Sequence, residues 1–185
     1  GQEPLRLLAD AGLRPAGIPN LYGAAAPGEP PAAEYRIVDY PYPDRRLFEN
    51  QLYVPLPNQS RRLRVTSLIT STGCPYGRCR FCFQAGGHSL AYVRRPVADV
   101  LAEIGGLQEL GFEEVSFWDD IFTVNRQWVL EFCRQVQQVF PGLLWSCYGS
   151  VKTVDVELLT ALRAAGCYSI YYGFESGNDE ILKAI

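Results

Sequence analysis

The sequence predicts an α/β fold in which parallel strands alternate with helices. From Arg62 onward, short runs rich in β-branched and aromatic residues alternate with longer segments of helical periodicity. One of these helical segments has Pro96 at its start and Gly111 at its end, where those residue types are favoured. Four strand–helix units in succession imply right-handed crossovers between parallel strands. The architecture is then either an open doubly wound sheet or part of a barrel.

The expected elements follow one another through the second part of the chain. Strands are expected at 63–70 (LRVTSLIT), 113–118 (EEVSFW), 143–149 (LLWSCYG) and 167–175 (CYSIYYGFE). Helices are expected at 96–111, 125–140 and 154–166, and Asn125 and Asp155 are their expected N-caps. Apolar faces recur at helical spacing, at Val97, Val100, Leu101, Ile104 and Leu107, and then at Val129, Phe132, Cys133, Val136 and Phe140.

The first third of the chain differs from the rest in composition and periodicity. Nine of the 13 prolines lie between Pro15 and Pro57, and no helical or strand period persists there. We interpret residues 1–61 as the end of a preceding domain and an extended connector, and residues 62–185 as the core. The aromatic residues of the connector predict that it lies against a surface. The chain starts at Gly1, lacks Met and stops within a helical pattern, so we interpret it as a piece of a longer protein.

Composition narrows the classes of function. The 185 residues are 48% hydrophobic and carry a formal net charge of -3, which is typical of a globular domain and gives no support for nucleic acid binding. No apolar run reaches the roughly 18 to 20 residues of a membrane span, and the amino end lacks the pattern of a signal peptide. We therefore expect a soluble cytoplasmic protein without a membrane or nucleic acid partner.

Polar residues follow each expected strand. A cysteine cluster follows the first strand, and the next three strands are followed by Asp119 and Asp120, by Ser150, and by Glu175 and Ser176. Chemistry in parallel α/β folds collects at the carboxyl ends of the strands. The sequence therefore predicts a site at this rim.

The six cysteines fall into two groups. Cys133, on an apolar helix face, and Cys147 and Cys167, within strands, are interpreted as small buried hydrophobes. Cys74, Cys79 and Cys82 share one loop at C-x4-C-x2-C spacing, which is typical of metal ligands. With His88 they would make a closed Cys3His zinc site, although His88 is better interpreted as a polar loop residue. Alternatively, the three thiolates would hold an iron–sulfur cluster with one iron open to a ligand.

Three segments carry a family resemblance. The segments "GCPYGRCRFC" (73–82), "VSFWDDIF" (115–122) and "YYGFESGNDEILKAI" (171–185) resemble those of radical S-adenosylmethionine (radical SAM) enzymes, in particular the cobalamin-binding subgroup. The resemblance covers roughly residues 62 to 185. It implies a partial TIM-like (βα)6 barrel of parallel strands, truncated here after about four βα units.

The resemblance also implies a ligand set. Cys74, Cys79 and Cys82 would ligate a [4Fe-4S] cluster whose fourth iron chelates SAM. The predicted cofactor-binding residues are Phe81 near the adenine, Asp119 and Asp120 at the amino group, Glu175 at the ribose, and Ser150 and Ser176 at the neighbouring strand ends. The reduced cluster would cleave SAM to a 5'-deoxyadenosyl radical that abstracts a substrate hydrogen. No residue is assigned a catalytic role.

Two positions depart from the pattern of the resembled family. The family spacing is C-x3-C-x2-C, and Gly77 would absorb the extra residue because glycine tolerates unusual backbone angles. Ser150 stands where the subgroup tends to carry an Arg, and Lys152 is the candidate to replace that cation.

Further partners follow from the resemblance. Cobalamin is expected only through a domain upstream of this chain, in which case the reaction would be methyl transfer. Without it, oxidation, cyclisation or rearrangement would follow hydrogen abstraction. The expected partners are a small-molecule or peptide substrate and an electron donor such as flavodoxin or ferredoxin.

Overall fold

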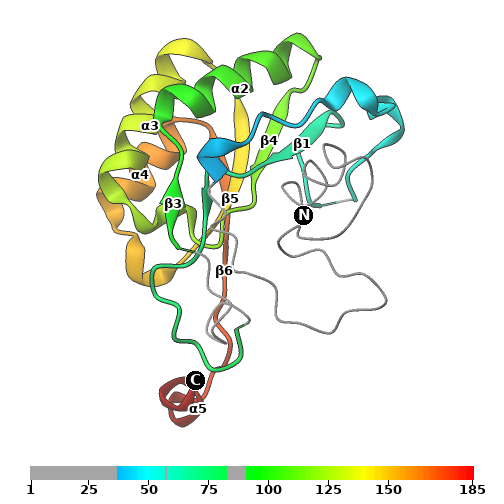
Figure 1. Cartoon of the computed structure of the whole chain (residues 1–185). Coiled ribbons are helices and arrows are strands. Elements are labelled where there is room, and N and C mark those ends of the chain that lie inside the picture. The colour runs from blue at the N-terminus through cyan, green and yellow to red at the C-terminus, as the bar shows by residue number, and fades with distance from the viewer. Residues whose placement is uncertain (1–36, 57, 83–90) are drawn as a thin grey trace, which may run out of the picture. The chain divides into compact units, whose positions relative to one another are not determined.

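A four-stranded parallel sheet forms the centre of the protein (Figure 1). The computed structural model describes residues 37–56, 58–82 and 91–185. The sheet runs in the order β1-β4-β5-β6, formed by β1 (Val65–Leu68), β4 (Glu114–Phe117), β5 (Leu144–Gly149) and β6 (Cys167–Tyr172). Each strand pairs in parallel with the next. The four predicted strands are confirmed.

Helices connect these strands, as predicted. They are α2 (Val97–Glu109), α3 (Arg126–Val139) and α4 (Val156–Ala164), and the shorter α5 (Asp179–Ala184) follows β6. Pro96 is the N-cap of α2. The side chains of Asn125 and Asp155 accept hydrogen bonds from Trp128 N and Leu158 N, which confirms both as N-caps.

The winding distinguishes between the two predicted architectures. The parallel strands lie in the same order in the sheet as in the chain, and α2, α3 and α4 lie together on one face (Figure 1). A doubly wound sheet would reverse its strand order and carry helices on both faces. The described part of the chain is therefore wound in one direction, as in a segment of a (βα) barrel.

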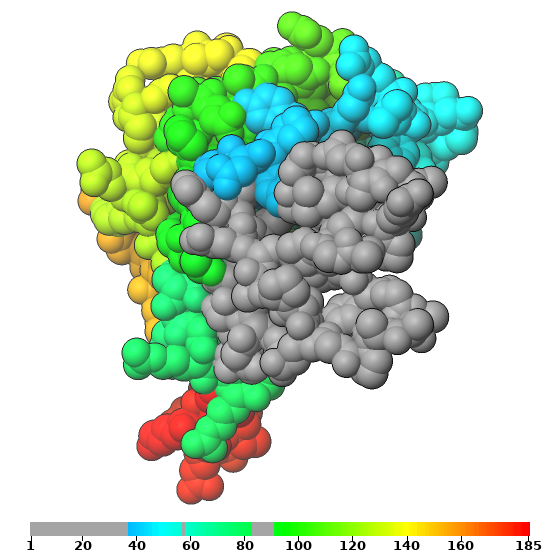
Figure 2. Space-filling model, in the orientation of Figure 1, coloured from blue at the N-terminus to red at the C-terminus, as the bar shows by residue number. Residues whose placement is uncertain are grey.

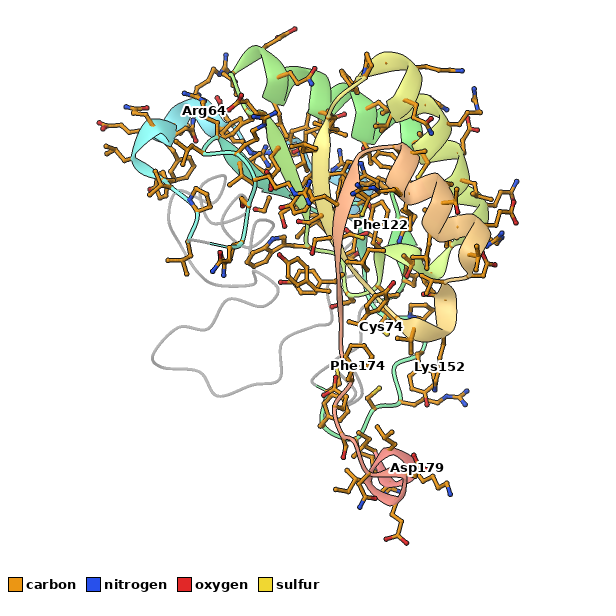
Figure 3. All side chains as sticks on the ribbon, turned by 180° about the vertical axis from the view of Figure 1, so that it is seen from behind. Arg64, Cys74, Phe122, Lys152, Phe174 and Asp179 are labelled. Atoms are coloured by element: carbon orange, nitrogen blue, oxygen red, sulfur yellow. The ribbon has the colours of Figure 1, made fainter. Side chains whose placement is uncertain are left out.

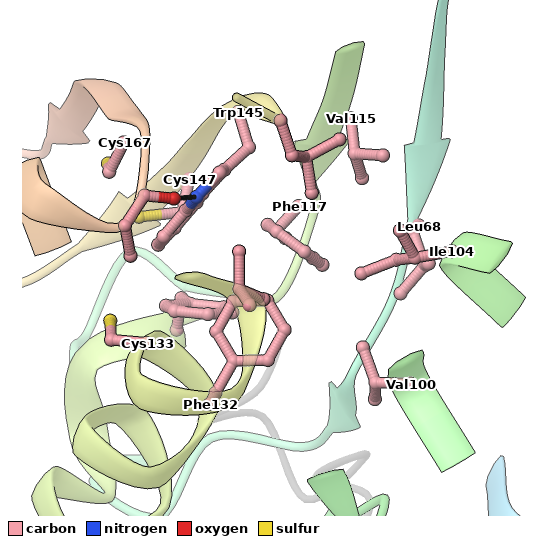
Figure 4. Close-up of a cluster of buried hydrophobic side chains, with 14 of the residues drawn as sticks. Leu68, Val100, Ile104, Val115, Phe117, Phe132, Cys133, Trp145, Cys147 and Cys167 are labelled. Carbon is pink, nitrogen blue, oxygen red and sulfur yellow. Dashed lines mark hydrogen bonds between the residues drawn. The ribbon is translucent and has the colours of Figure 1, made fainter. Parts of the chain in front are cut away.

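An aromatic core fills the space between the sheet and the helices (Figure 4). Phe117 packs edge-on against Phe132 and Trp145, with ring centroids 5.5 and 5.3 Å apart. The indole of Trp145 donates to Ala165 O at 2.7 Å, so its one polar atom is satisfied. This core fixes the strands from the helix side and leaves the opposite face of the sheet to other contacts.

A short antiparallel pair was not predicted. β2 (Ser71–Thr72) pairs with β3 (Val93–Arg94) just beyond the carboxyl end of β1. Two residues per strand are too few for a period of two to be recognised. The pair brings Arg94 beside the residues that lead into the cysteine loop.

The described part of the connector packs on the core. It contains the 3-10 helices η1 (Ile37–Asp39), η2 (Arg45–Leu47) and η3 (Asn50–Leu52). Arg45 donates to Ser67 O at 2.7 Å on the outer edge of β1 and forms an ion pair with the buried Glu103 of α2 at 3.0 Å. Arg45 thereby covers part of a strand edge that would otherwise be open to another chain. This contact agrees with the prediction that the connector lies against a surface.

A second stretch of the connector closes the amino end of the sheet. The buried carboxylate of Glu114 accepts hydrogen bonds from Arg61 N and Arg62 N, both at 2.9 Å, and from the hydroxyl of Tyr168 at 2.5 Å. The Tyr168 hydroxyl oxygen also lies 3.2 Å from Gln59 O. We call residues 59–62 the floor segment.

Removing the Tyr168 hydroxyl tests whether its hydrogen bond to Glu114 stabilises the fold. We expect Tyr168→Phe to lower the free energy of unfolding by about 1.5–3 kcal/mol, because a hydrogen bond to a buried charged group is lost. Tyr171→Phe is the matched control, since its hydroxyl makes only an exposed contact of 3.5 Å with Gln59 O. Denaturant unfolding measures both variants. Equal stability of the two variants would show that the bond between Tyr168 and Glu114 does not contribute to stability.

Among the described residues, no helix has the combination of length and hydropathy that a transmembrane span needs. The longest described helix, α3, has 14 residues.

Candidate functional site

The cysteine loop leaves the sheet at the carboxyl end of the first strand. β2 leads into Gly73, whose φ is 78°, and then into Cys74. Gly77 has a φ of 52°, in the left-handed region that glycine adopts readily. Gly77 therefore adopts a backbone angle of the kind that glycine tolerates, as expected of the residue that takes up the insertion between Cys74 and Cys79. That the loop closes on a cluster stays a prediction. Cys82 N donates to Cys79 O at 3.0 Å, so the second and third cysteines share one tight turn.

Two other strand ends face this loop. Burial raises the pKa of the Cys79 thiol, and the nearby Cys82, Cys74 and Glu175 raise it further, whereas Lys152 lowers it. The Lys152 ammonium also lies 5.7 Å from the ring centre of Tyr76, within the cysteine loop. Figure 3 shows Cys74, Lys152 and Phe174 in the same region of the molecule. The predicted convergence of strand ends is therefore present for the loops after β1, β5 and β6.

The last helix borders the same loop. Arg80 N donates to Ile185 O at 3.1 Å, directly after α5. The cysteine loop and α5 lie side by side in Figure 2, with the loop in green and the helix in red. Asn178 caps α5 by accepting from Glu180 N and Ile181 N.

Three thiols lie in the loop that follows β2. Cys74, Cys79 and Cys82 are all half-buried. Within the described residues, no group of three or more His, Cys, Asp or Glu side chains is arranged to hold a metal ion. Thiolates are the ligands that an iron–sulfur cluster takes, and three of them would leave one iron of a [4Fe-4S] cluster without a protein ligand, so the donor set fits such a cluster. His88, the fourth expected ligand of a zinc site, lies outside the described residues.

The other three cysteines belong to the core. Cys133, Cys147 and Cys167 are buried among the aromatic and aliphatic side chains of the core (Figure 4). Burial raises the pKa of Cys133 to about 12. A hydrogen bond with Cys167 and burial raise the pKa of Cys147. Neutral, enclosed thiols are poor metal ligands, which agrees with their predicted role as hydrophobes.

Asp119 points into the protein. Its carboxylate accepts from Thr70 N at 2.6 Å, from the Thr70 hydroxyl and from the Ser71 hydroxyl at 2.8 Å. Arg94 lies 3.5 Å away, and the side chains of both are almost fully buried. This arrangement differs from the predicted contact of Asp119 with the amino group of a ligand. Asp119 instead holds the segment that carries the chain from β1 into the cysteine loop.

Arg94 was missed by sequence reasoning. Its guanidinium donates to Phe122 O at 3.0 Å and lies 4.5 Å from the ring centre of Trp128. It therefore joins β3, the Asp119 loop and the start of α3. Its only signal in the sequence is the pair of arginines before Pro96.

Glu175 has a strained backbone. It is one of two non-glycine residues with positive φ in the described ranges, at 55°. Its Oε1 atom would stand 2.3 Å from a Cβ added at Gly173, so the carboxylate folds back over that glycine. Strain of this kind tends to gather at functional sites.

The remaining predicted site residues lie at the strand ends with varied exposure. Asp120 and Phe81 are exposed, Phe81 by 57%. Ser150 and Ser176 are half-buried. The Ser150 hydroxyl accepts from Lys152 N at 3.3 Å, and the Ser176 hydroxyl accepts from Asn178 N at 3.0 Å. Ser150 thus shapes the turn that contains Lys152, and Ser176 shapes the turn that leads into α5. Their contacts with a ligand stay predictions.

Comparisons with known proteins match this region. The family model of the radical SAM superfamily matches residues 68–185. An uncharacterized methyltransferase of Pyrococcus horikoshii is 27% identical over 77% of this chain and 33% of its own length. A cytidylyl-2-hydroxyethylphosphonate methyltransferase of Streptomyces wedmorensis is 32% identical over 66% of this chain and 23% of its own.

A solved structure also matches. The radical SAM methyltransferase TsrM of Kitasatospora setae, with tryptophan and a SAM analogue bound, superposes with a TM-score of 0.57 and 25% identity, over 64% of this chain and 23% of that one. A second structure of TsrM contains cobalamin and a [4Fe-4S] cluster. The chain thus spans about a quarter to a third of the length of these similar proteins.

Proposed function

The chain belongs to the radical SAM superfamily, and we propose that, within a longer protein, it holds a [4Fe-4S] cluster on Cys74, Cys79 and Cys82 and binds SAM beside it. One observation carries the proposal: the three half-buried thiols stand beyond the first parallel strand, where Glu175 and Lys152 from two other strand ends act on Cys79. Three thiolates would leave one iron of the cluster open to a second ligand, whereas a closed zinc site has no open position.

Each strand end has a role in binding SAM. Lys152 supplies the cation that pairs with the carboxylate of SAM, Glu175 accepts from its ribose hydroxyls, and Asp120 accepts from its amino group. Phe81 packs on the adenine. Ser150 and Ser176 position Lys152 and Glu175 through their turns. When bound, the reduced cluster supplies the electron that cleaves the sulfonium bond of SAM.

The relatives support a proposal for the reaction of the whole protein. We propose methyl transfer to a small molecule, with cobalamin bound by a domain outside this chain. The similarity to two methyltransferases, and to the cobalamin-containing TsrM structure, supports this class. A flavodoxin or ferredoxin is the proposed electron donor. A cytoplasmic location is proposed because all six cysteines are unpaired, and thiols are kept reduced there.

Reconstitution of the full-length protein tests the cluster. Anaerobic loading with iron and sulfide should give a brown protein with broad absorbance near about 400 nm and about four irons per chain. A matched sample offered zinc together with iron and sulfide should still form the cluster and retain no zinc. A colourless protein that binds one zinc per chain would overturn the proposal.

Substitution of Glu175 tests the ribose contact. We expect Glu175→Gln to weaken SAM binding roughly tenfold, because a hydrogen bond to a charged acceptor becomes a neutral one. Equilibrium dialysis with SAM gives the affinity, and iron content on the same samples shows whether the cluster is intact. Glu180→Gln, which removes an exposed charge from α5, is the matched control. If both variants bind SAM equally well, Glu175 does not contact the ribose.

A further inference from the structure

A buried carboxylate joins the connector to the core. The side chain of Glu103, on α2, is 4% exposed and has one arginine at each of its oxygens. Arg45 of the connector lies 3.0 Å from Oε1, and Arg95, which precedes α2, lies 2.7 Å from Oε2. The two arginine side chains are largely buried as well, at 12 and 6% exposure. We call Arg45, Glu103 and Arg95 the connector latch.

Arg45 binds β1 at two positions. Its Nε donates to the hydroxyl of Thr66 at 3.1 Å, and its Nη2 donates to Ser67 O at 2.7 Å. Because Nη1 donates to Glu103, each of the three guanidinium nitrogens has a partner outside the connector. This planar fork is specific to arginine, since a lysine ammonium is a point charge on a flexible stem.

Arg95 binds the residues that follow β1. Its guanidinium donates to Ile69 O at 2.9 Å, and its backbone N donates to Thr70 O at 2.8 Å. The N–H of Thr70 donates in turn to the carboxylate of Asp119 at 2.6 Å. Cys74 follows Thr70 by only four positions. The latch therefore reaches the base of the cysteine loop.

Tyr42 gives the connector a second contact with the same group of charges. Its hydroxyl donates to Asp99 Oδ1 at 2.5 Å, and its ring centre lies 5.1 Å from the guanidinium of Arg95. Asp99, on α2, also forms an ion pair with Arg95 at 2.6 Å. A cation over an aromatic ring adds to the attraction between connector and core.

The charges around the latch balance only when the connector is in place. With Arg45 present, two guanidinium groups face the two carboxylates of Glu103 and Asp99. Without it, Arg95 alone would serve both carboxylates, and Oε1 of Glu103 would be buried without a partner. Removing one member of a buried ion pair is costly, because the other charge stays desolvated.

Arg95 is the group able to respond to that loss. Among the described residues, its Nη2 atom has no hydrogen-bond partner. Turning the guanidinium to bring Nη2 to the vacated oxygen of Glu103 would take Nη1 away from Ile69 O, which it holds at 2.9 Å. Loss of the connector contact would thus be passed to the residues that follow β1.

We propose that Arg45 is a positioning residue for the cluster: through the connector latch it fixes the carboxyl end of β1 and so the place of Cys74. This inference rests on the proposed function, which assigns Cys74 as an iron ligand. Arg45 acts through Glu103 and Arg95, in the way that outer residues orient the ligands of a metal. Any change that withdraws the connector from α2 would therefore loosen a ligand of the cluster.

Hydrogen exchange tests the coupling before any cluster is loaded. Amide exchange of residues 69–74 is followed by mass spectrometry in the full-length protein without iron. We expect Arg45→Gln to speed exchange in this stretch at least about tenfold and to leave β6 unchanged, because only the end of β1 loses its fixed partners. Arg46→Gln is the matched control, since the exposed side chain of Arg46 pairs with Asp44 in its own turn. It should leave residues 69–74 unchanged.

A second comparison separates positioning from a general loss of stability. Tyr168→Phe removes a hydrogen bond to Glu114 beside the floor segment, at the other end of the sheet, so it should not speed exchange at residues 69–74. If Arg45→Gln does not fold, Arg45→Lys replaces it, because lysine keeps the charge but loses the fork, and faster exchange is expected in the same stretch. Exchange at residues 69–74 no faster than in Arg46→Gln, or an equal increase in all four parallel strands, would overturn the inference.

The loaded protein supplies two further readouts. Iron release to a chelator should be at least about tenfold faster in Arg45→Gln than in the parent or in Tyr168→Phe, because loss of an outer residue typically weakens metal binding about 10–100-fold. At a SAM concentration that saturates the parent, the electron paramagnetic resonance signal of the dithionite-reduced cluster should change less in Arg45→Gln. Unchanged iron release would overturn the positioning role. A parent that holds no iron would instead overturn the proposed function, and exchange at residues 69–74 would still decide whether the latch fixes β1.

Discussion

Cys79→Ser is expected to abolish iron binding. The serine keeps the size of the side chain but replaces a soft thiolate by a hydroxyl, which does not hold an iron–sulfur cluster. The reconstituted full-length variant should lose the absorbance near about 400 nm and bind well below the roughly four irons per chain of the parent. SAM cleavage should fall below detection. Iron content and absorbance after desalting measure the effect.

A core thiol provides the matched control. Cys133→Ala also removes one sulfur, but from a buried position on α3 that packs in the hydrophobic core. This variant should keep its iron and lose only a little stability. Retention of about four irons by Cys79→Ser would mean that the cluster is held elsewhere.

Asp119→Asn is expected to have the largest effect on stability. The substitution leaves the buried Arg94 guanidinium without its counter-charge. With an amide nitrogen in place of Oδ2, it also turns a donor toward Arg94 and toward the hydroxyls of Thr70 and Ser71, which donate to Oδ2. Breaking a buried ion pair at one partner costs about 3–5 kcal/mol. Denaturant unfolding followed by tryptophan fluorescence measures the loss. The same variant should retain less iron, because the segment before the cysteine loop is no longer fixed.

Asp155→Asn is the control for this substitution. Asp155 is an exposed N-cap of α4 that also forms an ion pair with Arg126 on the surface. Asparagine caps a helix as well as aspartate does, and surface ion pairs contribute little, so stability should hardly change. Similar losses in the two variants would show that Asp119 acts as an ordinary surface carboxylate.

The sequence predicted the parallel strands well, because each carries a long apolar or alternating signal between capped helices. The residues that flank each cysteine in the sequence also distinguished the three loop cysteines from the three core cysteines. It could not predict β2 and β3, which have two residues each. The rule that polar residues gather at the carboxyl ends of parallel strands predicted that Glu175 lies near the cysteine loop. Its charge does act on Cys79, although 96 positions of sequence separate the two residues.

Side-chain direction was beyond the sequence. Asp119 and Asp120 are identical in type and adjacent, yet one is buried and the other exposed. Which of them turns inward depends on Thr70, Ser71 and Arg94, all remote in the chain. Residue type fixes what a carboxylate can do, whereas the packing around a strand end decides what it contacts.

The proximity of the cysteine loop to the segment after β6 has a consequence for biosynthesis. Glu175, whose charge acts on Cys79, is synthesised 96 residues after it. At about 5–20 residues per second, the nascent thiols are without this neighbour for about 5–20 s. During that interval the thiols are open to oxidants and to competing metals. Cluster loading is therefore expected to follow the emergence of β6 and Glu175 from the ribosome.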